Sequence, residues 1–94
     1  MREAAIERRL KQKVEAAGGK ALKFTSPGWA GAPDRLVLMP NGRMVFVELK
    51  APGRKPRPIQ LKRHDVLRAL GFEVVVIDSP EGVDEFIRRW ADGV

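Results

Sequence analysis

Met44-Val-Phe-Val-Glu-Leu-Lys50 is the stretch of this chain that decides its fold. It reads as a buried strand that nevertheless carries two charges. Side chains alternate between the faces of a strand, so Glu48 and Lys50 share one face. The other face is apolar and carries Val45, Val47 and Leu49. Charged residues are seldom placed on a buried strand unless they are paired or functional. We therefore place the candidate site on this strand.

A second strand is expected just upstream, from Asp34 to Met39. Asn41-Gly42 separates the two apolar runs, and this dipeptide is a strong hairpin signal. The strands should pair antiparallel, which brings the start of the first beside the end of the second. Asp34 is therefore expected close to Glu48 and Lys50.

The flanking segments predict three helices and two further strands. A helix is expected from Arg2 to Ala17, closed by Gly18-Gly19, and a short strand from Lys20 to Phe24. A helix from Ile59 to Leu70 should face inward through Ile59, Val66, Leu67 and Leu70, with Gln60 and His64 sharing another face.

The last part of the chain predicts a crossover and a closing helix. The run Phe72–Asp78 is almost continuously apolar, which favours a strand covered on both faces and parallel to Met44–Lys50. Ser79-Pro80 is typical of a helix start. The apolar stripe of that helix is Val83, Phe86, Ile87 and Trp90. The expected fold is α/β, in the order α-β-β-β-α-β-α, with a small mixed sheet flanked by helices.

The length, composition and charge of the chain limit the classes of protein to which it can belong. The 94 residues suit a single domain, 1–94, and 44% of them are hydrophobic, which favours a packed fold. There is no cysteine, so disulfides and thiolate metal sites are excluded, and one histidine argues against a His-based zinc site. No apolar run approaches the roughly 20 residues that span a bilayer, and no signal peptide is visible. We expect a cytoplasmic protein without a membrane partner. The net charge of +6 favours a polyanionic partner.

Several residues near the site keep two interpretations. Glu3 and Glu7 lie on or beside the apolar stripe of the first helix. They either complement the helix dipole or supply an acid to the site. Glu3 lies nearer the middle of the apolar stripe, which favours Glu3. The distance along the helix from Gly18 back to Glu7 matches the length of the strand that returns toward Asp34, which favours Glu7, and we lean to Glu7.

Trp29, in a loop of turn-forming residues, either folds onto the core as a lid or contacts bases or a second subunit. The loop Ala51–Pro58 carries three cations and no acid, and is either a solvated linker or a phosphate-binding loop. Its cations are Arg54, Lys55 and Arg57.

Two carboxylates beside a lysine suit phosphodiester hydrolysis. Carboxylates hold Mg²⁺, a hard cation that prefers oxygen ligands. Such a metal polarises a phosphoryl oxygen and acidifies a bound water, and Lys50 could stabilise the transition state. The backbone carbonyl of Leu49 could complete the ligand set, and a helix acid could add to it.

The same residues resemble a known family. Pro33-Asp34 followed by Glu48-Leu49-Lys50 is similar to the signature of the PD-(D/E)XK nuclease superfamily, and more closely to its VRR-NUC branch, the virus-type replication-repair nuclease domain. The further matching motifs are Ile6-Glu7, Gly18-Gly19, Lys23 to Gly28, Gly31 to Arg35, Phe46 to Gly53, Gln60 and Leu70-Gly71-Phe72.

The resemblance implies a restriction-endonuclease-like sheet and a Mg²⁺- or Mn²⁺-dependent, structure-selective DNA endonuclease. Stand-alone members are similar to Holliday-junction resolvases, so the implied substrate is branched, flapped or four-way DNA. The implied assembly is a homodimer, in a bacterial or phage-infected cell. Two coordinated cuts also fit a twofold dimer. The alternative is a junction-binding module that does not cut.

The resemblance also assigns roles. Asp34 and Glu48 would bind metal, Lys50 would be catalytic, and Gln60 would be an accessory residue. The DNA contacts expected with these roles are Lys23, Trp29, Arg35, Arg54, Lys55 and Arg57.

Overall fold

Three helices and four strands follow one another in the predicted order in the computed structural model, which describes residues 2–91. They are α1 (Glu3–Ala16), β1 (Lys20–Lys23), β2 (Arg35–Met39), β3 (Arg43–Leu49), α2 (Pro58–Ala69), β4 (Val74–Ile77) and α3 (Pro80–Ala91), with a short turn of 3-10 helix, η1 (Pro40–Gly42), between β2 and β3. The predicted α-β-β-β-α-β-α order is confirmed.

The sheet has the strand order β1-β2-β3-β4. The first two pairings are antiparallel, and β3 pairs with β4 in parallel through the crossover that contains α2. The hairpin turn has Asn41 at φ 70° and Gly42 at φ 73°. Only glycine and asparagine adopt this left-handed backbone readily, which explains why Asn-Gly occupies the turn. The predicted hairpin and crossover are therefore both present.

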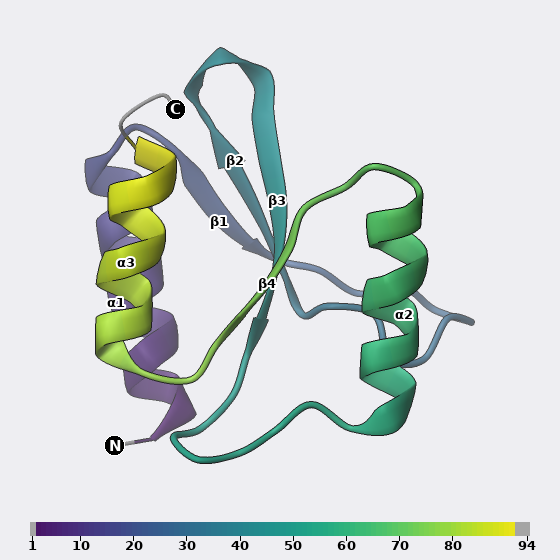
Figure 1. The fold of residues 1–94 in the computed structure, drawn as a ribbon. Helices are drawn as coiled ribbons and strands as arrows, with labels where there is room; N and C mark the ends of the chain where they lie inside the picture. Colours follow the sequence, from purple (N-terminus) through teal and green to yellow (C-terminus); the bar gives the residue numbers. More distant parts are fainter. Residues whose placement is uncertain (1, 92–94) are drawn as a thin grey trace.

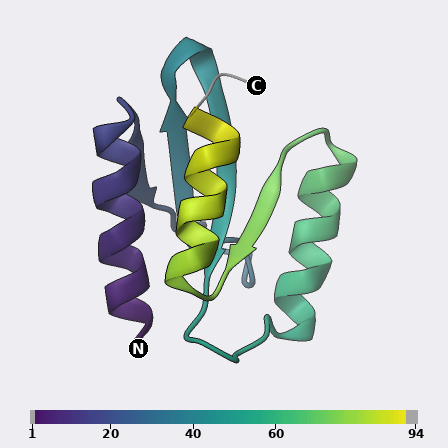
Figure 2. The same cartoon turned by 60° about the vertical axis from the view of Figure 1, so that its left-hand side comes forward.

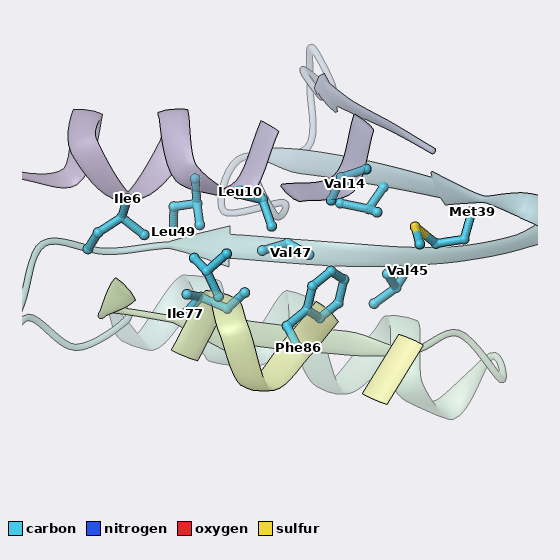
Figure 3. Packing of buried hydrophobic residues seen from close by; sticks show 11 residues of the cluster. Ile6, Leu10, Val14, Met39, Val45, Val47, Leu49, Ile77 and Phe86 are labelled. Atoms are coloured by element: carbon cyan, nitrogen blue, oxygen red, sulfur yellow. The ribbon is translucent and has the colours of Figure 1, made fainter. Parts of the chain in front are cut away.

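Helices cover the two faces of the sheet unequally. α1 and α3 lie side by side on one face and α2 lies alone on the other (Figures 1 and 2). The main core fills the space beneath α1 and α3, where apolar side chains from the sheet meet those of the two helices (Figure 3). Its members are Ile6, Leu10, Val14, Val37, Met39, Val45, Val47, Leu49, Ile77, Val83 and Phe86. Val45, Val47 and Leu49 thus share the face that the strand alternation predicted.

A smaller apolar cluster lies on the α2 face of the sheet. Phe46, Leu67 and Val74 form its buried centre. The ring of Phe46 stands edge-on to Phe24 and Phe72, with centroids 5.6 and 5.9 Å away. Glu48 follows Phe46 on this same face, so its carboxylate lies under α2 rather than in the main core.

The predicted ends of the helices are also present. The N–H of Gly19 donates to the carbonyl of Val14 at 2.9 Å, which closes α1 at the predicted glycine pair. The hydroxyl of Ser79 accepts the N–H of Gly82 at 2.9 Å, which caps α3. Trp90 packs against the main core from α3, as expected for a member of the apolar stripe of that helix.

Two burial predictions are wrong. α2 faces inward through Gln60, His64 and Leu67, while Val66 and Leu70 are 41% and 69% exposed. The prediction assumed that apolar residues are the buried ones, but this helix covers a polar site. The second error concerns β4, which lies at the edge of the sheet and leaves Val76 37% exposed. An edge strand covered by one short helix is not buried along both faces. Within residues 2–91, no helix is both long and apolar enough to span a membrane.

Candidate active site

The hairpin brings two carboxylates together at one end of the sheet. Arg35 pairs with Val47 in the β2–β3 register, and Asp34 and Glu48 stand one step beyond that pair. Asp34 Oδ1 accepts the backbone N–H of Leu49 at 3.1 Å, which fixes this carboxylate against the last residues of β3. The predicted approach of Asp34 to Glu48 and Lys50 is therefore present.

Glu48 is buried among three polar side chains. It is only 2% exposed, and α2 covers it. Its Oε2 atom accepts a hydrogen bond from Gln60 Nε2 at 3.2 Å and lies 3.7 Å from Lys50 Nζ. Its Oε1 atom lies 3.4 Å from His64 Nε2. Both carboxylate oxygens thus have a polar neighbour, and Gln60 donates to Oε2. Buried carboxylates usually have such partners.

Burial disfavours the ionised form of both carboxylates. Burial raises the pKa of Asp34 to about 6, helped by the charges of Glu48 and Glu3 and opposed by the Leu49 N–H. Burial also raises the pKa of Glu48, against the lowering effect of the Lys50 ammonium and of Arg57. Two nearby carboxylates with raised pKa values form a site that a bound cation would stabilise.

The two acids of α1 occupy different environments. Glu7 forms an ion pair with Arg35, whose guanidinium also donates to the carbonyl of Asp34 at 2.8 Å. Glu3 is exposed, and its charge contributes to the raised pKa of both Asp34 and Glu48. The preference for Glu7 considered only how far along the helix axis each acid lies, and not which way its side chain points. Glu7 pairs directly with Arg35, and the charge of Glu3 acts on Arg35 as well as on the two carboxylates. Which of the two acids serves the site stays a prediction.

Gln60 connects α2 to the site. Its Oε1 atom accepts the backbone N–H of Arg57 at 2.8 Å, and its Nε2 atom donates to Glu48. One amide therefore fixes both the start of the helix and the carboxylate. Sequence reasoning placed Gln60 near the site, and the structure does so as well.

His64 was absent from the predicted site, although it lies four residues after Gln60. One helical turn separates the two, so both face Glu48. The signal was visible in the sequence as a shared helical face, but nothing in the sequence said which face pointed inward.

Trp29 packs over the smaller apolar cluster. It is half-buried there, and the guanidinium carbon of Arg63 lies 5.1 Å from its ring centroid. Arg63 also donates to the carbonyl of Ala30 at 2.8 Å. Gly31 holds the same loop close to α2, since a Cβ there would come within 2.9 Å of the Ile59 carbonyl oxygen. Of the alternatives for Trp29, this arrangement corresponds to the lid on the core.

The cations predicted to contact DNA divide into buried and exposed groups. Arg35 is 8% exposed and paired with Glu7, which favours a structural role over a phosphate contact. Lys23 is exposed at the end of β1 and lines a cavity of about 440 Å³ between α1 and β1. The cations of the loop after β3 are all exposed, namely Arg54, Lys55 and Arg57.

The donor set suits a hard divalent cation. Asp34 and Glu48 supply carboxylate oxygens, and the backbone carbonyl of Leu49 lies between Glu48 and Lys50 in the chain. Within residues 2–91, no three acidic or histidine side chains are grouped closely enough to hold a metal by themselves. Mg²⁺ accepts such a sparse site, because it commonly uses one or two carboxylates and keeps several waters.

Fold and site together define a small nuclease domain of restriction-endonuclease-like architecture. The chain is 54% identical to "Putative nuclease p44" of Acyrthosiphon pisum secondary endosymbiont phage 1 over 81 residues, covering 86% of this chain and 87% of the phage protein. A solved structure described as a VRR_NUC domain superposes with a TM-score of 0.87 at 38% identity, over 94% of this chain and 96% of that one. No family model matches the sequence. On these similarities the chain belongs to the VRR-NUC family of the PD-(D/E)XK nuclease superfamily.

Proposed function

We propose that this protein is a Mg²⁺- or Mn²⁺-dependent DNA endonuclease that cuts branched DNA as a homodimer. One observation carries the proposal: Asp34 and Glu48 converge beside Lys50 at the end of the β2–β3 hairpin. The family membership supports phosphodiester hydrolysis at this place. The net charge of +6 supports a polyanionic substrate.

The metal would be held by Asp34, Glu48 and the carbonyl of Leu49. When bound, Mg²⁺ or Mn²⁺ supplies Lewis-acid polarisation of a phosphoryl oxygen and lowers the pKa of a bound water. The Lys50 ammonium is positioned beside Glu48 to stabilise negative charge that develops on the phosphoryl group. Gln60 keeps Glu48 in place by its amide hydrogen bond.

The surroundings of the site support binding of a DNA backbone. The exposed loop that follows Lys50 carries Arg54, Lys55 and Arg57, and it contains no acid. Phosphates can therefore approach Lys50 along a positively charged surface. Each chain has one such site, and the paired cuts that resolve a four-way junction would require two sites related by a twofold axis.

The test is cleavage of a panel of labelled four-way junctions, flaps and linear duplexes with Mg²⁺, Mn²⁺ or a chelator. We expect metal-dependent cuts in branched DNA. Asp34→Ala and Lys50→Ala should each lower the cleavage rate by about 100-fold or more. Matched controls are Glu85→Ala and Lys13→Ala, which change exposed side chains in the layer of α1 and α3.

Each part of the proposal can fail separately. If Asp34→Ala and Lys50→Ala cut as fast as the wild type, the site assignment is wrong. Tight junction binding without cleavage under either metal would identify a binding module on a nuclease fold. Sedimentation of the free protein as a monomer at all concentrations would overturn the homodimer.

A further inference from the structure

His64 is a fully buried polar side chain that the proposed mechanism does not use. It lies in the middle of α2 and has no exposed surface. Its Nε2 atom faces Glu48 Oε1 at 3.4 Å. Among the described residues, its Nδ1 atom has no hydrogen-bond partner. The imidazole therefore directs its one polar contact at the candidate active site.

A role in packing alone explains His64 poorly. Leaving a buried polar atom without a partner costs about 1–3 kcal/mol. A leucine would fill the space beneath α2 without this cost, as Leu67 does one turn later. The cost of the unpaired Nδ1 atom is offset only if the contact of His64 with Glu48 serves the site.

The contacts of Glu48 show what His64 adds. Gln60 and Lys50 both approach Oε2, so neither restrains the other oxygen. His64 alone, of these three side chains, approaches Oε1. A carboxylate held at one oxygen can still rotate about the bond to that group, whereas one held at both oxygens has a fixed plane.

We propose that His64 is a positioning residue, which orients Glu48 for metal binding by donating from Nε2 to Oε1. This inference rests on the proposed metal-dependent nuclease function. It assigns a hydrogen on Nε2, because Nε2 is the ring nitrogen that faces a carboxylate acceptor. Groups that orient a metal ligand in this way typically change metal affinity by 10- to 100-fold when they are removed.

Three substitutions separate positioning from packing. His64→Leu removes the hydrogen-bond donor and fills the same space with an apolar side chain of similar size. His64→Gln places an amide nitrogen at about the reach of Nε2, toward Glu48. His64→Asn offers a nitrogen only at about the reach of Nδ1, where no partner lies among the described residues. Glu48→Gln serves as the reference for loss of the metal ligand.

The first measurement is binding of MnCl2 by isothermal titration calorimetry, without DNA, on protein checked for folding by circular dichroism and thermal unfolding. We expect His64→Leu and His64→Asn to weaken Mn²⁺ binding at least about tenfold and His64→Gln to stay within about threefold of the wild type. In cleavage assays the first two should lower kcat with little change in KM, because His64 is buried and cannot touch DNA.

The outcomes distinguish this inference from the proposed function. A wild-type protein that binds Mn²⁺ and cuts, together with a His64→Leu variant that does so equally well, overturns only the role of His64. Equal rescue by glutamine and asparagine also overturns it, because the geometry of Nε2 would then be irrelevant. A folded wild-type protein that neither binds Mn²⁺ nor cuts would overturn the proposed function, and the positioning role with it.

Discussion

At the scale of single residues, Asp34 shows the conflict between function and stability. Its Oδ1 atom accepts a hydrogen bond from the Leu49 N–H, which lowers its pKa. Burial and two nearby acids nevertheless hold this pKa at about 6, above the ordinary 3.8. The folded protein therefore binds a proton more tightly than the unfolded chain does. Its free energy of unfolding falls as the pH rises from about 4 through 6, and the penalty is fully present at neutral pH.

Asp34→Asn should accordingly stabilise the metal-free protein at neutral pH. We expect a gain of about 1 kcal/mol in the free energy of unfolding, a value reduced for solvent screening because the side chain is 33% exposed. The asparagine oxygen can still accept the Leu49 N–H. The gain should shrink as the pH falls from 6 toward 4, since wild-type Asp34 then becomes protonated.

Urea unfolding of the two proteins across this pH range measures the effect. Asp65→Asn is the matched control, because its side chain is 80% exposed, and we expect it to change stability by less than about 0.5 kcal/mol. An Asp34→Asn protein no more stable than the wild type at neutral pH would contradict this account of the site.

At the scale of elements, α1 is attached to the sheet by the ion pair of Glu7 with Arg35. The guanidinium is buried, so removal of Glu7 leaves it with only the more distant Asp34 carboxylate, 4.0 Å away. Glu7→Gln should lower the free energy of unfolding by about 1–2 kcal/mol, less than for a fully buried pair because the Glu7 side chain is 38% exposed. Glu3→Gln should leave stability within about 0.5 kcal/mol.

Cleavage assays complete this comparison of the two acids. If Glu3 supplies the third acid of the site, Glu3→Gln should slow cleavage about tenfold or more at saturating DNA. Glu7→Gln should retain most of its activity at temperatures where it is folded. A stable Glu7→Gln protein without activity would return the role of third acid to Glu7.

The elements also show what the sequence could and could not predict. The hairpin and the approach of Asp34 to Glu48 were predictable, because Asn41-Gly42 fixes the pairing locally. The inward face of α2 was not. Burial of apolar residues is the usual rule, but an active site reverses it by burying polar groups that bond to each other. His64 is buried for this reason, whereas Leu70 lies just past the end of α2 and is exposed.

The choice between Glu3 and Glu7 depended on information that the sequence lacks. Both acids belong to one helix, and their positions along its axis were predictable from the rise per residue. Which acid faces Arg35 depends on how α1 is rotated and tilted against the sheet. Packing between distant elements sets that rotation, so no local pattern reveals it.

At the scale of the whole molecule, the exposed loop after β3 predicts how DNA binding depends on salt. Arg54, Lys55 and Arg57 follow the site directly and are exposed, with no acid among residues 51–58. Each phosphate neutralised by such a cation adds about 0.9 to the slope of log affinity against log salt concentration for duplex DNA. Replacing all three by glutamine should therefore reduce the slope by about 2–3 for each protomer that contacts DNA.

Fluorescence anisotropy with a four-way junction, in a chelator to prevent cleavage, measures this slope. The control replaces three exposed cations of the α1–α3 layer, Lys13, Arg88 and Arg89, by glutamine. It lowers the net charge by the same amount but changes the side of the sheet opposite α2 (Figure 2). If attraction by net charge alone governs binding, the two triple variants will behave alike. If the loop lies on the DNA backbone, only the variant of Arg54, Lys55 and Arg57 will show a weaker dependence of affinity on salt. Counterion release requires local contact with phosphate.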